Sequence, residues 1–153
     1  MATGDDDTEE LNLGLLLFIP YRYLESAVLA ELKRHGHDLP LNQARVFQRI
    51  DAHGSRLGEL AQAAQLSKQT VGSIVDQLEA AGYVRRIPDP ADARARLVTV
   101  TAKGQTLVEL SVPVIREIET AWESELGHAR MRQLKETLTA LRASTDPYHR
   151  THD

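Results

Sequence analysis

The stretch RLGELAQAAQLSKQTVGSIVDQLEAAGYV, residues 56–84, decides the fold of this chain. Its first part has an apolar face at helical spacing, formed by Leu57, Leu60, Ala61 and Ala64. A break follows at Gln65–Leu66, and Ser67 is a good N-cap for a second helix. That second helix has a buried stripe of Val71, Ile74, Val75 and Leu78, and Gly82 suits its left-handed end. Two helices joined by so short a turn predict a helix-turn-helix.

The outer face of the second helix carries small and polar side chains, namely Lys68, Gln69, Gly72, Ser73, Asp76 and Gln77. A recognition helix needs short or hydrogen-bonding side chains there, because its backbone must approach the edges of bases. Gly72 and Ser73 are expected to allow that approach, and Ser67, Lys68 and Gln69 to supply hydrogen-bond donors. The alternative is an ordinary surface helix of an all-α protein.

A hairpin follows in YVRRIPDPADARARLVTVT, residues 83–101. Tyr83–Ile87 and Leu97–Thr101 can pair as antiparallel strands, and the prolines keep PDPADARA between them out of regular structure. An arginine at the tip of such a loop suits the negative potential of a narrow minor groove. The alternative is a solvated hairpin whose arginines pair with Asp89 and Asp92.

Helical patterns flank this centre. Helices are predicted over about 11–34, with Pro20 as a kink or a late start, and over 41–54, with a loop at 35–40 between them. Thr101 can cap a long helix through about Leu126, which Pro113 should bend. A further helix over 128–144 has an apolar stripe of Met131, Leu134, Leu138 and Leu141. A lone helix cannot bury such a stripe, so it packs on another subunit or on the rest of the chain.

The run LAQAAQLSKQTVGSIVDQLEAAGYVRRIPDPADARARLVTVTAKG, residues 60–104, resembles the multiple-antibiotic-resistance regulator (MarR) family of prokaryotic transcription factors. The wing of that family reads Asp-x-Arg and, several residues later, Leu/Val-Thr-x-x-Gly. Here these positions are Asp92, Arg94, Val100, Thr101 and Gly104. Val100 stands where leucine is commoner.

The resemblance implies a mainly α fold with a small β-hairpin wing, a winged helix-turn-helix with N- and C-terminal dimerisation helices. It implies one domain over 11–144, with dimerisation helices at 11–36 and 104–144 and a DNA-binding lobe at 41–103. Residues 1–10 are expected to be a disordered acidic tail, and 145–153 a flexible tail.

The same resemblance implies a homodimer that binds double-stranded DNA, by family default as a repressor. Symmetry then predicts a pseudo-palindromic operator with half-sites roughly 34–36 Å apart. Residues in or beside the major groove are Ser67, Lys68, Gln69, Thr70 and Ser73. Arg94 enters the minor groove, with Asp92 steadying the wing, and the expected phosphate contacts are Arg85, Arg86 and Arg96.

Family members often release DNA when a small aromatic or anionic molecule binds. Candidates for that ligand site, by placement only, are Tyr21, Arg22, Phe47 and Arg116. The alternatives are plain core and surface roles for these residues. Metal-responsive control is a competing possibility, because His35 and His37 lie in one expected loop and, with His53 near them, three histidines could hold zinc. No cysteine assists them, and we expect no metal site and no cofactor.

Composition limits the other classes of function. Net charge is −4, but residues 55–104 carry seven Lys or Arg against five Asp or Glu, so a basic centre separates acidic flanks. No motif of an enzyme is found, and an interaction module without DNA is the remaining alternative. The apolar run at 11–24 is shorter than the roughly 20 residues that span a bilayer, and the N-terminus is acidic, so a cytoplasmic protein without membrane contact is expected.

Overall fold

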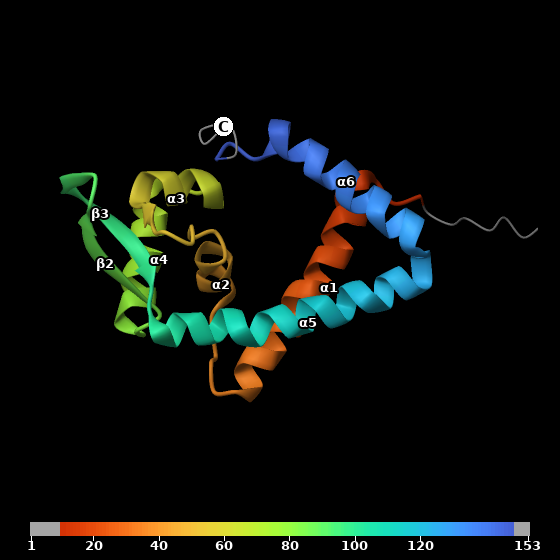
Figure 1. Ribbon diagram of the computed structural model, residues 1–153, viewed down its shortest axis with the longest axis horizontal. Coiled ribbons are helices and arrows are strands. Elements are labelled where there is room, and N and C mark those ends of the chain that lie inside the picture. Colours follow the sequence, from red (N-terminus) through yellow and green to blue (C-terminus); the bar gives the residue numbers. More distant parts are fainter. Residues whose placement is uncertain (1–9, 149–153) are drawn as a thin grey trace, which may run out of the picture.

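The computed structural model describes residues 10–148, and within them the chain forms six helices and a three-stranded sheet (Figure 1). This confirms the predicted mainly α fold. The elements are α1 (Leu13–Arg34), α2 (Leu41–Phe47), β1 (Ser55–Arg56), α3 (Leu57–Ala64), α4 (Lys68–Ala80), β2 (Val84–Asp89), β3 (Asp92–Val100), α5 (Ala102–Leu126) and α6 (His128–Thr145). The predicted acidic tail lies, apart from Glu10, outside the described residues.

The helix-turn-helix of α3 and α4 forms as its sequence predicts. Gln65 adopts a left-handed conformation with φ of 57° and reverses the chain after α3. The Ser67 hydroxyl then accepts a hydrogen bond from the backbone N–H of Thr70 at 3.1 Å and caps α4. The apolar stripe of α4 is buried, and Gly82 follows the helix with φ of +84°.

The sheet differs from the predicted simple hairpin. Its strand order is β1-β3-β2, because Ser55 and Arg56 pair with Val98 and Leu97 of β3. Two residues have no periodicity, so sequence reasoning could not find β1. The predicted loop PDPADARA is mostly strand, because Pro88 is in β2 opposite Arg96 and β3 already begins at Asp92. The strand tolerates this proline because β2 is at the edge of the sheet, where a missing N–H breaks no ladder.

The predicted helix over 41–54 is too long. It ends at Phe47, and tight turns follow in which Arg49 and Ile50 bond back to the carbonyls of Val46 and Phe47. Gly54 does not end a helix but lets the chain approach β3: a Cβ there would lie 2.9 Å from Thr99 Cγ2.

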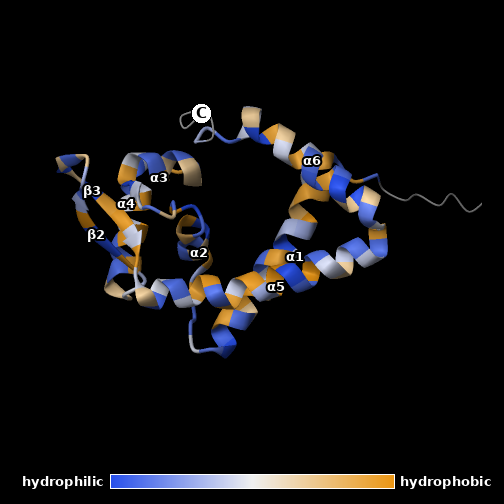
Figure 2. Ribbon diagram, in the orientation of Figure 1, coloured by the Kyte–Doolittle hydropathy of each residue, from blue (hydrophilic) through white to orange (hydrophobic). Residues whose placement is uncertain are grey.

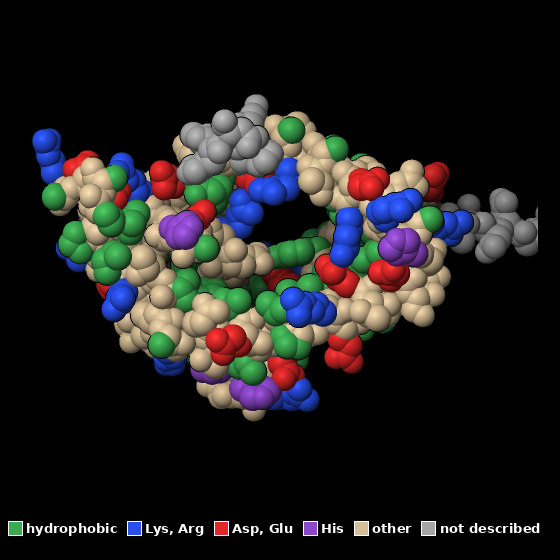
Figure 3. Space-filling view, in the orientation of Figure 1, with side chains coloured by type: hydrophobic (Ala, Val, Ile, Leu, Met, Phe, Trp, Pro, Cys, Tyr) green, Lys and Arg blue, Asp and Glu red, His purple; other side chains and the backbone are tan. Residues whose placement is uncertain are grey.

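The three long helices enclose an opening beside the winged lobe. α5 leads away from β3, and α6 folds back from its far end toward α3 (Figure 1). The space-filling view shows an opening between these parts (Figure 3). Thr101 caps α5 as predicted, by accepting from the N–H of Gly104, and Pro113 lies inside that helix. Asn12 caps α1, so Pro20 is an interior residue of α1 rather than its start.

The core lies in the lobe and at its junction with α1 and α5. Val46, Leu60, Leu78, Val98 and Leu107 are almost completely buried. The first half of α1 is different, because its apolar residues, coloured orange in the hydropathy view (Figure 2), are exposed. By length and composition α1 would suffice to cross a membrane, a test that helices of soluble proteins also pass. Its second half, however, packs on the core through Leu29 and Leu32.

The end of the chain also differs from expectation. The predicted flexible tail begins at 145, but α6 continues through Thr145, and Asp146 is 8% exposed and ion-paired with Arg49. Residues 149–153 lie outside the described residues.

Candidate DNA-binding surface and ligand pocket

The recognition-helix candidates lie at the exposed N-terminal end of α4. Ser67, Lys68, Gln69, Thr70 and Ser73 are all solvent-exposed. Gly72 differs from its predicted role, because it is half-buried and a Cβ there would lie 3.5 Å from Leu57 Cδ2 of α3. Position 72 therefore faces α3, and a Cβ there would make an ordinary van der Waals contact with Leu57.

The wing holds Arg94 at its exposed tip. The Asp92 carboxylate accepts a hydrogen bond from the backbone N–H of Arg94 at 3.0 Å, which fixes the backbone rather than the guanidinium. Asp89 accepts from the N–H of Ala91 at 2.8 Å and pairs with Arg56 at 2.6 Å. These two interactions hold the pKa of Asp89 below its usual value, so this carboxylate, at the turn between β2 and β3, is charged at neutral pH.

The other wing arginines have different surroundings. Arg85 is exposed, whereas Arg86 pairs with Asp76 at 2.7 Å and with Glu79 at 3.0 Å, both from α4. Arg96 donates to the backbone carbonyl of Arg86 at 3.4 Å. These two carboxylates compensate the charge of Arg86, and the ion pairs join β2 to α4.

A surface hollow brings the two predicted DNA-contacting parts together. It lies between the start of α3, the start of α4 and β3, and four cations line it: Arg56, Lys68, Arg86 and Arg96. Glu59 is the acidic residue in its lining. Arg56 and Arg86 are ion-paired with Asp89 and with Asp76 and Glu79, whereas no ion pair of Lys68 or Arg96 is seen within the described residues. Lys68 and Arg96 are therefore the cations of this hollow that suit a phosphate backbone, since phosphate contacts dominate affinity for DNA.

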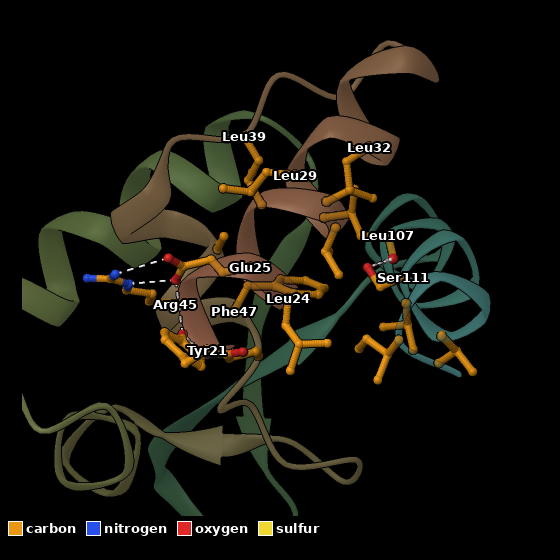
Figure 4. A pocket seen from close by; sticks show the side chains of 16 residues that line it. Tyr21, Leu24, Glu25, Leu29, Leu32, Leu39, Arg45, Phe47, Leu107 and Ser111 are labelled. Atoms are coloured by element: carbon orange, nitrogen blue, oxygen red, sulfur yellow. Dashed lines mark hydrogen bonds and ion pairs between the residues drawn. The ribbon is translucent and has the colours of Figure 1, made fainter. Parts of the chain in front are cut away.

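A second cavity, of about 400 Å³, lies between α1, α2 and α5 (Figure 4). Two of the four ligand-site candidates, Tyr21 and Phe47, line it. Arg22 and Arg116 do not line it: Arg22 pairs with Glu25, and Arg116 is exposed on α5. The lining is mostly apolar, with Leu24, Val28, Leu107 and Ile115 among its members.

Sequence reasoning missed the charged pair at this cavity. Arg45 Nε donates to Glu25 Oε2 at 2.8 Å, and the Tyr21 hydroxyl donates to the same oxygen at 3.0 Å (Figure 4). The Glu25 side chain is only 7% exposed. Hydrogen bonds from Arg45 lower the pKa of Glu25 and outweigh its burial, so that the pKa falls from 4.5 to about 2. Neither residue has a local sequence signal, because the pairing joins two helices.

The Glu25 carboxylate makes the free energy of unfolding depend on pH. Its lowered pKa means that the stabilisation is complete above about pH 4.5 and is lost as pH falls toward 2. The difference in unfolding free energy between the wild type and Glu25→Gln is therefore expected to be largest at neutral pH and to shrink below pH 4.5. Denaturant unfolding of both proteins from pH 7 to 2.5 measures it, and a constant difference would contradict the ion pair.

The histidines considered for a metal are engaged separately. His35 Nδ1 lies 3.0 Å from the Glu31 carbonyl, and His37 Nδ1 lies 2.9 Å from the Tyr83 hydroxyl. Across residues 10–148, no group of three or more His, Cys, Asp or Glu side chains is placed to hold a metal ion. His149 and His152 lie outside the described residues.

The winged lobe also matches known proteins. The family model for the MarR family matches residues 37–95, from the end of the α1–α2 loop into the wing. The transcriptional regulator HosA of Escherichia coli O127:H6 is 31% identical over 108 residues, which cover 65% of this chain and 80% of HosA. The chain belongs to the MarR family. The resemblance in the sequence is thereby confirmed, and so is the prediction that the chain is not an enzyme, since its relatives are transcriptional regulators.

Two other matches to curated regulators are shorter, and the chain spans 38% of the activatory protein BadR of Rhodopseudomonas palustris and 58% of HosA of Escherichia coli O111:H-. The relatives' names include both an activatory protein, BadR, and a repressor, NicR.

Solved structures share the fold over most of this chain. The transcriptional regulator PA4135 is 25% identical with a TM-score of 0.68, covering 88% of this chain and 98% of PA4135. NadR in complex with 4-hydroxyphenylacetate, at 24% identity and a TM-score of 0.67, covers 92% of this chain and 97% of NadR.

Proposed function

We propose that this MarR-family chain is a homodimeric, sequence-specific binder of double-stranded DNA that represses transcription and is released by a small molecule. The observation that carries the DNA-binding part is the single hollow lined by Lys68 of α4 and Arg96 of β3. Recognition helix and wing thus present cations to one surface although the whole chain has a net charge of −4. Exposed polar side chains at the start of α4 supply the base contacts.

The dimer is proposed from the exposed apolar side chains of α1. Leu13, Leu16, Phe18, Ile19 and Tyr23 are each more than half exposed. A soluble monomer rarely exposes so continuous an apolar surface. Leu134, Leu138 and Leu141 of α6 add to it, at about 40% exposure each. A second copy buries both sets, whereas a membrane span would separate α1 from the ion pair and core contacts that its second half makes with the lobe.

A charge placed in this apolar surface is expected to break the dimer. Phe18→Glu puts a carboxylate where the partner's apolar side chains should pack, and an unpaired buried charge costs several kcal/mol. Analytical ultracentrifugation should show a dimer for the wild type and a monomer or aggregate for the variant. Leu66→Glu, at an equally exposed leucine of the α3–α4 turn, is the matched control and should stay dimeric. Two dimeric variants would reject this interface.

The effector is proposed to bind in the cavity beside Tyr21 and Phe47. The aromatic and apolar side chains of this cavity suit a small ring. Arg45 also lines the cavity and suits an anionic group, which would bind the guanidinium alongside the Glu25 carboxylate. NadR, which shares the fold, was solved with 4-hydroxyphenylacetate, a molecule of this chemistry.

We further propose that the protein acts in the cytoplasm, where a DNA-binding regulator of this kind meets its operator.

The decisive experiment is a fluorescence-polarisation titration of the protein on the DNA upstream of its own gene. A scrambled duplex of equal length is the comparison, and both are measured at two salt concentrations. Tight binding to the upstream region alone, weakening steeply with salt, is expected because neutralised phosphates release counterions. Equally weak, salt-insensitive binding to both duplexes would favour a winged helix that contacts a protein.

A further inference from the structure

Two ion pairs join the winged lobe to the long helices, in addition to the shared core. The first lies between α2 and α1: Arg45 donates to Glu25 from Nε at 2.8 Å and from Nη2 at 3.1 Å. The bidentate geometry fixes the direction of approach as well as the distance. Because the Glu25 side chain is 7% exposed, solvent and salt screen this pair only in part.

The second ion pair joins the lobe to the end of α6. Arg49 Nη2 lies 3.0 Å and 3.1 Å from the two carboxylate oxygens of Asp146, and Arg49 Nε donates to the carbonyl of Ala63 in α3 at 2.9 Å. Arg142 donates to Asp146 at 3.1 Å. Burial raises the pKa of Asp146, but the hydrogen bonds from Arg49 and Arg142 outweigh it, so the pKa stays below its usual value and the pair is charged at neutral pH.

The two pairs hold one short segment from two directions. Arg45 and Arg49 are four residues apart, but their partners come from α1 and from the far end of α6 (Figure 1). Asp146 is 97 residues from Arg49 in sequence and directly follows α6. Their ion pair therefore joins the end of α6 to the lobe, beside the opening that the space-filling view shows (Figure 3). The shared core already joins the lobe to α1 and α5, and the two ion pairs add directional contacts at two separate points, which restrict the rotation that apolar packing alone permits.

We propose that Arg45 and Arg49 are positioning residues that, through Glu25 and Asp146, fix the orientation of the recognition helix relative to the long helices. This inference rests on the proposed function, since orientation affects activity only if α4 reads DNA. In a dimer the long helices set the separation of the two lobes, and half-sites one helical turn apart accept a narrow range. A lobe that swings fits the operator only part of the time, and its apparent affinity falls by that fraction.

Spin labels within one chain test the orientation without DNA. The chain has no cysteine, so Ala80→Cys at the exposed end of α4 and Ala129→Cys at the exposed start of α6 give two defined sites. Labelled protein diluted into excess unlabelled protein reports the distance within one chain, whether or not it dimerises. The variants are Glu25→Gln and Asp146→Asn, which each remove one carboxylate charge while keeping the size of the side chain. Glu136→Gln is the matched control, because it removes a carboxylate from an exposed α6 pair, with Arg132.

The wild type and Glu136→Gln should give the same narrow distance distribution. Glu25→Gln and Asp146→Asn should each broaden this distribution, because each leaves one of the two ion pairs without its carboxylate charge. Operator affinity should fall about tenfold in the two single variants if one dimer in ten has both lobes in the competent orientation. Their far-ultraviolet circular dichroism and sedimentation should match those of the wild type.

Two results separate this inference from the proposed function. Unchanged distance distributions in both single variants would overturn the positioning role, even if DNA binding weakened. Broadened distributions in a protein whose wild type binds no DNA would support the positioning role and reject the proposed function.

Discussion

Replacing Gly104 by alanine is expected to lower the free energy of unfolding by at least about 3 kcal/mol, near the upper end for overpacked sites. Gly104 is buried in the first turn of α5, and a Cβ there would lie 2.1 Å from the Tyr83 carbonyl oxygen and 2.8 Å from Val100 Cγ1. The carbonyl cannot withdraw easily, because it accepts a hydrogen bond from the N–H of Thr101 at 3.1 Å. Thermal unfolding followed by circular dichroism should show a Tm lowered by roughly 10 °C.

Gly58→Ala is the control for this variant. Gly58 also lies in the first turn of a helix, α3, but no atom would lie within 4 Å of its new Cβ. Alanine there should raise stability by up to about 1 kcal/mol, because glycine is the poorer helix former. An equal effect of the two substitutions would mean that α5 does not approach Tyr83 as closely as the structure shows.

The position of Gly104 also explains part of the sequence motif that identifies the family. Thr101 caps α5 through the N–H of Gly104 and donates its hydroxyl to the Gly82 carbonyl at 2.5 Å. Gly82, Thr101 and Gly104 thus connect the end of α4, the end of β3 and the start of α5 through hydrogen bonds. The Thr-x-x-Gly spacing records a close approach of two backbones, which only glycine allows.

Local features of the fold could be predicted because the information lies within a few residues. The stripe of α4, its Ser67 cap and the left-handed Gly82 each depend on neighbours one turn away. Features that depend on partners distant in the sequence could not be predicted. β1 exists only because Ser55 and Arg56 meet β3, and Pro88 is tolerated only because β2 is an edge.

The same distinction applies to the candidate sites. The exposed polar end of α4 and the arginine at the wing tip follow from periodicity and turn chemistry. The cavity residues Glu25 and Arg45, and the pair of Arg49 with Asp146, are charged residues on helices or just beyond their ends, a pattern that usually indicates a solvated surface. The two carboxylates are buried because α1, α2 and α6 bring distant arginines onto them, which no spacing in the sequence reveals.

Arg94→Ala is expected to weaken operator binding about 100-fold while leaving the dimer intact, since a dimer loses two contacts of about 1.4 kcal/mol each. The Arg94 guanidinium is at the exposed wing tip, and the Asp92 carboxylate contacts its backbone, so the charge is available to DNA. Removing two charges should also reduce the slope of log affinity against log salt by roughly 1.8. Polarisation titrations over a range of salt concentrations measure both quantities.

Two further variants separate the charge of Arg94 from its shape. Arg94→Lys keeps the charge, so it should retain the salt slope of the wild type but lose affinity, because an ammonium lacks the planar, weakly hydrated guanidinium that fits a narrow groove. Arg132→Ala removes an exposed arginine of α6, 63% exposed and far from the wing in sequence, and should alter neither quantity. If Arg94→Ala binds the operator as tightly as the wild type, then the wing does not enter the minor groove. Recognition would then rest on α4 and on the cations that line the hollow beside it.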